Sequence, residues 1–188
     1  MFSLSLEFLK TGVEQVTETP AISSFNRGAK LTLPLERTAL EQINYTKWFY
    51  SDDSKRLCKT IRDSYLTDKT NSYLKLNEKE NSFALNIPVN VSSDEFFFLL
   101  DYIKEKVLNK GFELRDAIQE AISNETSYIE FEIFYLFNPI TQQYVTLEIR
   151  SYKGKPQNIT GSCTSPSMGQ LPIVQSNFME CITDIFEL

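Results

Sequence analysis

Apolar and polar residues alternate most clearly in the middle of the chain, where the pattern predicts β-strands. Every second residue is apolar across residues 83–91, and Pro88 indicates an edge strand or a bulge there because proline cannot donate to a ladder. Residues 128–138 and 144–152 alternate in the same way, and residues 138–143 between them have the composition of a turn. A hairpin is therefore expected in this part of the chain.

The register of that hairpin can be predicted, because the apolar faces of its two strands must coincide. The odd positions of the first strand are apolar, so we expect Tyr135 to lie opposite Leu147 on the inner face. The same register places Glu132 opposite Arg150 on the outer face, where a pair of opposite charges contributes about 0.2–1 kcal/mol.

A helix with clear boundaries is predicted over residues 93–109. Ser92 and Glu95 have the spacing of a capping box, which satisfies the amides of the first turn. Gly111 follows the helix, where a left-handed C-terminal residue is expected. The stripe of apolar residues at helical spacing consists of Phe96, Leu99, Leu100, Ile103 and Val107.

Three further helices are expected at residues 36–50, from residue 51 onward and at residues 176–187. The first would turn Ala39, Leu40 and Ile43 towards the core. The second has a stripe of Leu57, Cys58, Ile61 and Tyr65, and the third has a stripe of Phe178, Cys181, Ile182, Ile185 and Phe186. Short strands are expected at residues 2–8, 31–35 and 73–76, and a loop at residues 11–30.

Two segments have weaker patterns. Residues 112–122 contain both alternating and helically spaced apolar residues, and we favour a strand because residues 123–126 would then form a turn into the next strand. Residues 154–175 are rich in glycine and proline and predict a loop of about 20 residues, a length usually associated with function or disorder.

These elements predict an α+β fold with a largely antiparallel sheet and helices packed mainly on one face. The whole chain, residues 1–188, is expected to form a single domain with its core in residues 31–153. The loop at 154–175 would lead to the C-terminal helix at 176–187, which would dock on that core. With 188 residues, 41% of them hydrophobic, the chain is long enough to bury such a core.

Composition and charge narrow the expected partners and location. The formal net charge of −6 argues against binding to nucleic acid or to anionic lipid. No apolar run approaches the roughly 18 residues of a membrane helix, so no membrane partner is expected. The first residues lack the features of a secretory signal, and three cysteines without close pairing are typical of reduced thiols. We therefore expect a cytoplasmic protein.

The absence of histidine limits the catalytic chemistry of the chain. Histidine is the commonest general base and metal ligand, so Ser-His-Asp, Cys-His and histidine-based zinc sites are excluded. Carboxylates such as Glu130 and Glu132 remain available for acid and base catalysis, although alternating glutamates are also typical of a solvated sheet face. We therefore assign no catalytic residue and expect neither a metal site nor a cofactor.

Five residues are candidates for a binding surface. On the predicted register, Phe134, Leu136 and Tyr144 form an apolar end of the outer hairpin face, which is either covered by another element or free to bind a partner. Trp48 and Tyr50 belong to an aromatic cluster of a kind enriched in binding hot spots, although packing is the commoner explanation for such clusters.

These observations favour a non-enzymatic protein-binding or adaptor protein of the chaperone, immunity or assembly type. It would bind a protein partner through an acidic surface and the apolar end of the sheet face. Two alternatives remain open. One is a carboxylate-dependent enzyme that acts on a sugar or another small substrate, and the other is a homo-oligomeric structural component, such as a homodimer.

Overall fold

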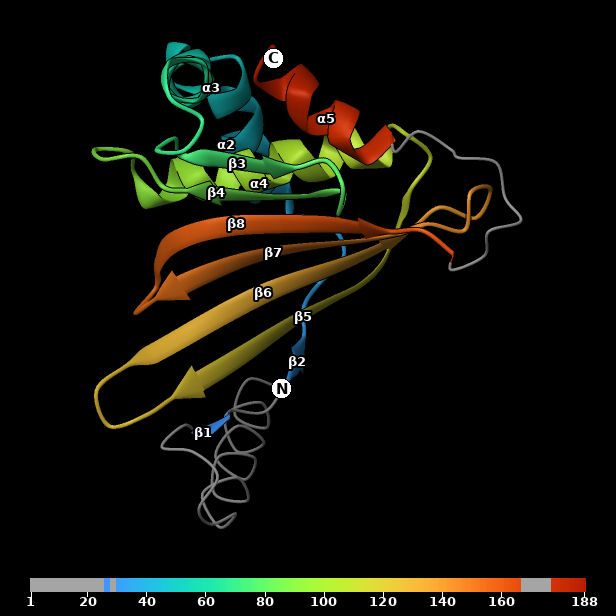
Figure 1. Ribbon diagram of the computed structural model, residues 1–188. Helices are drawn as coiled ribbons and strands as arrows, with labels where there is room; N and C mark the ends of the chain where they lie inside the picture. Colours follow the sequence, from blue (N-terminus) through green and yellow to red (C-terminus); the bar gives the residue numbers. More distant parts are fainter. Residues whose placement is uncertain (1–25, 28–29, 167–176) are drawn as a thin grey trace.

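A computed structural model describes residues 26–27, 30–166 and 177–188 of the chain, which form an α+β fold (Figure 1). The described part contains four helices and eight strands. The helices are α2 (Ala39–Phe49), α3 (Asp52–Thr67), α4 (Ser93–Leu108) and α5 (Asn177–Ile185). The strands are β1 (Asn26–Arg27), β2 (Leu31–Thr32), β3 (Leu74–Asn77), β4 (Ser82–Asn86), β5 (Glu113–Ser123), β6 (Tyr128–Phe137), β7 (Tyr144–Tyr152) and β8 (Lys155–Thr164).

All the strands belong to one antiparallel sheet. Its order is β1-β5-β6-β7-β8-β4-β3, and β2 pairs with β5 along the same edge as β1. Strands β5 to β8 follow one another as a meander. Strand β4 lies before α4 in the sequence but pairs with β8, the last strand of the meander. The sheet therefore joins the two halves of the chain.

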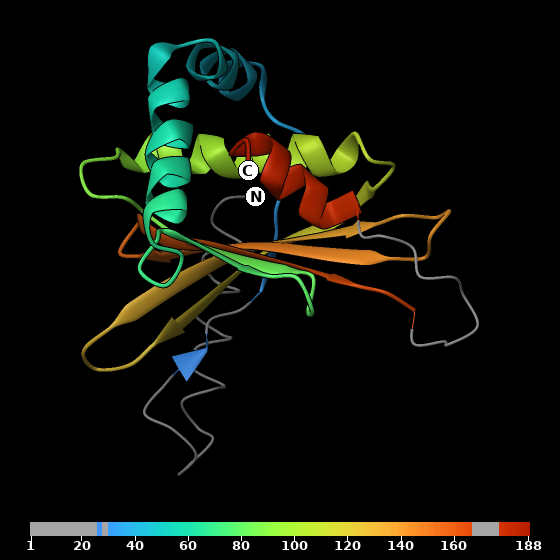
Figure 2. The same cartoon turned by 45° about the horizontal axis from the view of Figure 1, so that its top comes forward.

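The four helices cover one face of this sheet, and the core lies between the two layers (Figures 1 and 2). This arrangement confirms the predicted fold class. The largest fully buried side chains come from both layers and are Phe96, Phe178, Phe186, Ile61, Leu74, Leu85, Leu99, Leu100, Ile103, Leu136, Leu147 and Ile149.

Helix α4 matches its prediction closely. The Ser92 side chain accepts a hydrogen bond from the Glu95 amide at 3.3 Å and caps the first turn. All five residues of the predicted stripe are buried. Gly111 has φ of +92°, a conformation that glycine adopts without steric cost.

Helix α2 begins later than predicted and buries a different face. Thr38 and Glu41 form a capping box that fixes its start. The helix buries Tyr45 and Trp48, whereas Leu40 and Ile43 are 66% and 51% exposed, so the predicted inward face is wrong. The aromatic side offers more apolar area to bury against the rest of the protein, which explains this choice.

Residues 113–122 of the ambiguous segment 112–122 belong to strand β5, as favoured from the sequence. This strand pairs with β6 along nearly its whole length and has a bulge between Leu114 and Asp116. The Leu33 amide also donates to the Ala117 carbonyl at 2.7 Å, which extends the pairing of the opposite edge. Ladder hydrogen bonds on both edges outweigh the helical spacing of the apolar residues.

The loop predicted over residues 154–175 is wrong for residues 155–164, which form strand β8. Proline and glycine do not end this strand, because each occupies a position that accommodates it. Pro156 lies opposite Ser151, next to the register shift in the β7 and β8 ladder. Gly161 is buried where an added Cβ atom would overlap the Phe83 ring and lie 2.8 Å from Leu147 Cδ2 and 3.0 Å from Phe178 Cζ. Residues 167–176 lie outside the described part of the chain.

The strand predicted over residues 83–91 is shorter than expected and does not lie at an edge. Strand β4 ends at Asn86, two residues before Pro88, and it lies between β3 and β8. Proline therefore ends the strand instead of marking an edge. The predicted strand at residues 2–8 lies outside the described residues, and so does most of the loop predicted at residues 11–30, of which residues 26–27 form β1.

The predicted β6 and β7 register is wrong by one residue. Leu136 lies opposite Val145 and Glu132 lies opposite Ile149, so the even positions of β6 face the helices. A six-residue turn closed by Asn138 and Gln143 sets this register, because the Asn138 amide donates to the Gln143 carbonyl at 2.9 Å. The predicted cross-strand pair of Glu132 with Arg150 does not form.

Candidate functional site

The corner between α2 and α3 orients three consecutive aromatic residues. Ser51 caps α3, and the Ser54 hydroxyl lies 2.9 Å from both the Phe49 and the Ser51 carbonyl oxygens, to which it can donate. This tight connection leaves Trp48 only 5% exposed, whereas Tyr50 is 76% exposed. The corner therefore presents one large aromatic side chain to solvent beside two that pack inward.

A pocket of about 440 Å³ opens beside this corner, and we call it the α3–α5 pocket. Its lining combines the aromatic corner, one side of α3, part of α4 and the C-terminal turn after α5. The lining residues are Phe49, Tyr50, Ser54, Lys55, Cys58, Lys59, Arg62, Tyr102, Ile185, Phe186 and Glu187. The volume lies within the range of about 300–1,000 Å³ that is typical of ligand pockets.

Aromatic rings form one wall of the α3–α5 pocket. The Phe49 ring packs edge-to-face against Tyr50 at 5.0 Å between centroids and against Tyr102 at 5.1 Å. The Phe186 side chain contributes to the pocket while its bulk is buried in the core. This wall offers apolar area on a rigid support.

The α3 side of the pocket carries positive charge. Lys55, Lys59 and Arg62 lie along one side of α3, and among the described residues that line the pocket Glu187 is the one carboxylate. Arg62 Nη1 lies 2.7 Å from Glu187 Oε2, and Arg62 Nε lies 3.5 Å from Asp63 Oδ1. The pocket is therefore locally cationic in a chain whose formal net charge is −6.

Cys58 is the cysteine that lines this pocket. Burial, and to a lesser extent the charge of Glu187, raises the pKa of its thiol to about 11. The thiol is therefore protonated at neutral pH, and the thiolate needed for nucleophilic attack is not formed. The pocket is suited to binding and not to cysteine-based catalysis.

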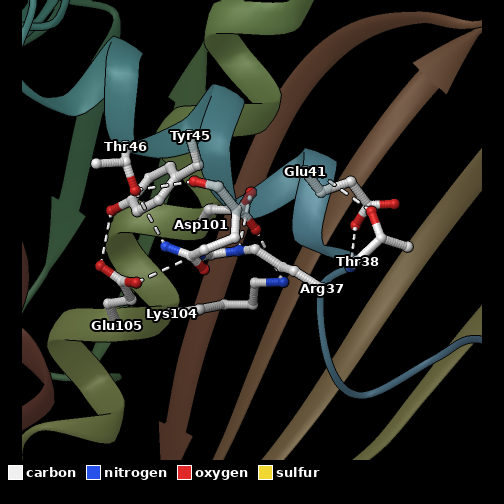
Figure 3. Close-up of polar contacts among 9 residues, drawn as sticks. Arg37, Thr38, Glu41, Tyr45, Thr46, Asp101, Lys104 and Glu105 are labelled. Carbon is white, nitrogen blue, oxygen red and sulfur yellow. Dashed lines mark hydrogen bonds and ion pairs between the residues drawn. The ribbon is translucent and has the colours of Figure 1, made fainter.

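A second pocket of about 470 Å³ lies between the segment before α2, helix α4 and strand β6, and we call it the Arg37 pocket. Figure 3 shows the polar contacts beside it. Arg37 Nη1 donates to Gln42 Oε1 at 2.7 Å and to Glu105 Oε1 at 3.2 Å, and Arg37 Nε lies 3.6 Å from Asp101 Oδ2. The guanidinium also lies 4.1 Å from the centroid of the Tyr45 ring.

These contacts hold α2 against α4. The Tyr45 hydroxyl donates to Glu105 Oε2 at 2.8 Å, so both oxygens of that carboxylate have partners. Burial and the hydrogen bond to Glu105 raise the pKa of Tyr45 well above its ordinary value. The cluster is accounted for as a structural connection between two helices.

Glu132 and Lys104 are among the residues that line the Arg37 pocket. Burial raises the pKa of Glu132, and the nearby carboxylates add to this effect while Lys104 opposes it. Lys104 Nζ lies 3.0 Å from Asp101 Oδ1 and 4.0 Å from the centroid of the Phe134 ring. A carboxyl group with a raised pKa could serve as a general acid. Within the described residues, no group of three or more His, Cys, Asp or Glu side chains is placed to hold a metal ion.

The structure separates the residues that the sequence suggested for binding. Phe134 and Leu136 are buried in the core. Of the two alternatives considered from the sequence, this end of the hairpin is therefore covered by another element and not free to bind a partner. Tyr144 lies on the opposite face of the sheet, 58% exposed, with its ring 4.7 Å from that of Phe137. Trp48 is in the core, and Tyr50 alone among the five lines the α3–α5 pocket.

The sequence interpretation missed the cationic side of α3. The spacing of Lys55, Lys59 and Arg62 places them on one helical face, and this signal was available once the helix was predicted. The contacts of Arg37 with Asp101 and Glu105 had no local signal, because they join residues more than 60 positions apart.

Searches of protein-family models, of curated proteins and of solved structures found no match for this chain. In the part of the chain that the structure describes, no helix is both long enough and apolar enough to cross a membrane. The geometry of the α3–α5 pocket and of its surroundings is therefore the basis for a functional proposal.

Proposed function

We propose that this chain is a non-enzymatic protein-binding protein whose partner docks on α2 and on the adjoining α3–α5 pocket. The observation that carries the proposal is an apolar stripe on the outer face of α2. Leu40, Ile43 and Tyr50 are 66%, 51% and 76% exposed. Helical spacing places Ile43 and Tyr50 on the side opposite Tyr45 and Trp48, and Leu40 at the edge of that side.

An exposed stripe of this kind is unusual at the surface of a soluble domain. Single exposed apolar residues need no explanation, but aligned ones form a surface that binding would remove from water. Tyr50 ends the stripe and also lines the α3–α5 pocket, so the two features form one continuous surface. Tyrosine in such a position is typical of binding hot spots.

This surface replaces the apolar sheet end considered from the sequence, since Phe134 and Leu136 are buried. Affinity would come from the apolar stripe and the aromatic wall of the pocket. The three free cysteines suit a reducing compartment, and we therefore propose that binding takes place in the cytoplasm.

Capture of a partner from the native host, followed by reconstitution with the purified partner, tests this function. The wild-type chain should retain one partner in a stoichiometric ratio, and the L40E/I43E variant should lose it. Both substituted residues are exposed, so the variant should fold normally, which circular dichroism can verify.

The matched control is V89E/I140E, which introduces the same two charges at exposed apolar residues in two loops outside α2. It should bind the partner as the wild type does. Recovery of no stoichiometric partner, or equal binding by both variants, would contradict the proposal. If light scattering shows a dimer that L40E/I43E converts to a monomer, the partner on α2 is a second copy of the chain and the homo-oligomeric alternative holds.

A second candidate function is favoured by the raised pKa of Glu132 in the Arg37 pocket. A carboxylate-dependent enzyme could use this group as a general acid towards a sugar or another small substrate. A panel of nitrophenyl glycosides offers a direct assay. Turnover by the wild type that is lost in the E132Q variant would support the enzyme, and no turnover of any member would favour binding.

A further inference from the structure

We infer that the partner segment recognised by the α3–α5 pocket is an acidic amphipathic helix, a deduction that rests on the proposed function and specifies its partner. Its apolar face would lie against the aromatic wall of the pocket. Its carboxylates would lie along Lys55, Lys59 and Arg62. Charge complementarity between these three cations and an acidic partner supports the assignment.

The arrangement of the cations favours a repeating series of carboxylates over a single one. Lys55, Lys59 and Arg62 are four and three residues apart, which places them in a row about 10 Å long on one side of α3. Acidic residues one helical turn apart on a partner helix have a similar spacing. A ligand with one carboxylate could satisfy only part of this row.

Two of the three cations are available for a partner. Among the contacts within the described residues, neither Lys55 nor Lys59 has an ion-pair partner, and both side chains are exposed. By contrast, Arg56, which does not line the pocket, lies 3.1 Å from Asp53 Oδ1. Within helix α3, the two cations without a compensating carboxylate, Lys55 and Lys59, therefore both line the pocket.

The C-terminal turn of the chain displays the same chemistry as the inferred ligand. Phe186 is buried against the pocket, and the next residue, Glu187, places its carboxylate 2.7 Å from Arg62 Nη1. An apolar anchor followed by a carboxylate therefore already occupies the Arg62 end. Glu187 has φ of +52°, an uncommon conformation for a residue other than glycine, so this contact is made by a strained backbone.

This arrangement makes Glu187 a competitor of the partner. Its side chain is 75% exposed, so the ion pair with Arg62 is weak and can be displaced. Removal of the Glu187 charge should strengthen binding of an acidic ligand by about twofold, because Arg62 keeps only Asp63 as a carboxylate partner and one repulsive charge is lost.

Fluorescence anisotropy with two labelled synthetic peptides tests the inference. Both peptides would be about four helical turns long, with Leu and Phe along one face. One would carry Glu at the remaining positions and the other Gln, so that only charge differs. The Glu peptide should bind the wild type about tenfold more tightly than the Gln peptide at low salt, and high salt should reduce this difference.

Charge reversal on α3 should remove the preference. The K55E/K59E variant should bind the Glu peptide at least tenfold more weakly, whereas E187Q should bind it about twofold more tightly. The K79E/K155E variant changes the net charge by the same amount at exposed lysines of the β-sheet hairpins that do not line the pocket, and it should behave as the wild type does.

Equal binding of the two peptides, equal effects of K55E/K59E and K79E/K155E, or no binding of either peptide would each overturn the inference. These outcomes are separate from the failure of the proposed function. A natural partner that is lost in L40E/I43E but unaffected by K55E/K59E would leave the binding function intact and show that the partner is not acidic.

Discussion

The Tyr45 hydroxyl donates a hydrogen bond of 2.8 Å to Glu105 Oε2 and so joins α2 to α4. The same carboxylate accepts a hydrogen bond from Arg37, whose guanidinium lies over the Tyr45 ring. Glu105, 60 residues after Tyr45 in the sequence, therefore fixes the position of α2 through Tyr45 and Arg37. Because α2 carries the exposed stripe of Leu40 and Ile43, the contact also orients the proposed docking surface.

Substitution of Tyr45 by Phe should destabilise the protein by about 1.5 kcal/mol. The variant keeps the buried ring and its contact with Arg37 but loses a hydrogen bond to a charged group. Urea denaturation followed by circular dichroism measures the change. Tyr144→Phe is the control, since that side chain is exposed at the end of β7, and an equal effect of the two substitutions would contradict the role given to Tyr45.

Substitution of Leu136 by Ala should cost about 2–5 kcal/mol of stability, because the side chain is fully buried and the cavity left behind would stay partly empty. Tyr144→Ala should cost far less, since Tyr144 is exposed on the other face of the sheet. Thermal denaturation of the two variants compares them. Equal, small losses would mean that Leu136 lies at a surface, as the predicted register would have it.

Most of the helices and strands could be predicted from the sequence because they depend on local signals, but strand β8 was predicted as part of a loop. Helix α4 has a cap, a stripe and a terminal glycine, and each of these acts within a few residues. The register of β6 and β7 could not be predicted, because β6 is apolar on both faces near the turn. Phe134 and Leu136 lie on one face and Tyr135 and Phe137 on the other, so alternation alone does not identify the inner face.

The candidate site was less accessible to sequence reasoning than the fold. Tyr50 was recognised as a candidate, but its neighbour in the pocket, Phe186, comes from the other end of the chain. Which face of α2 points outward depends on which face packs against α4. The Trp48 ring of α2 packs against the Phe98 ring of α4, with 5.7 Å between the ring centroids. Long-range packing of this kind leaves no periodic trace in the sequence.

Substitution of Gly161 by Ala should destabilise the protein by about 1–3 kcal/mol. An added methyl group would press most closely on the Phe83 ring and also on the Leu147 and Phe178 side chains, which are held in a packed core and have little room to move. Ser162→Ala is the control, because it changes the neighbouring residue of the same strand on the opposite face. Calorimetry would reveal the difference, and an unchanged melting temperature for Gly161→Ala would show that β8 packs less closely.

Substitution of Glu132 by Gln should stabilise the protein at pH 7, and the gain should vanish on acidification. Burial raises the pKa of Glu132 in the folded protein above its value in the unfolded chain, which is about 4.3. Both states are protonated below that pH, and as the pH rises the unfolded chain ionises first, so the wild type loses stability until the folded carboxyl also ionises. Glutamine cannot ionise and avoids this loss.

Urea denaturation at pH 7 and near pH 4 compares the variant with the wild type, and the exposed Glu78→Gln serves as the control. A stability difference that is the same at both pH values would show that Glu132 ionises as readily in the folded protein as in the unfolded chain.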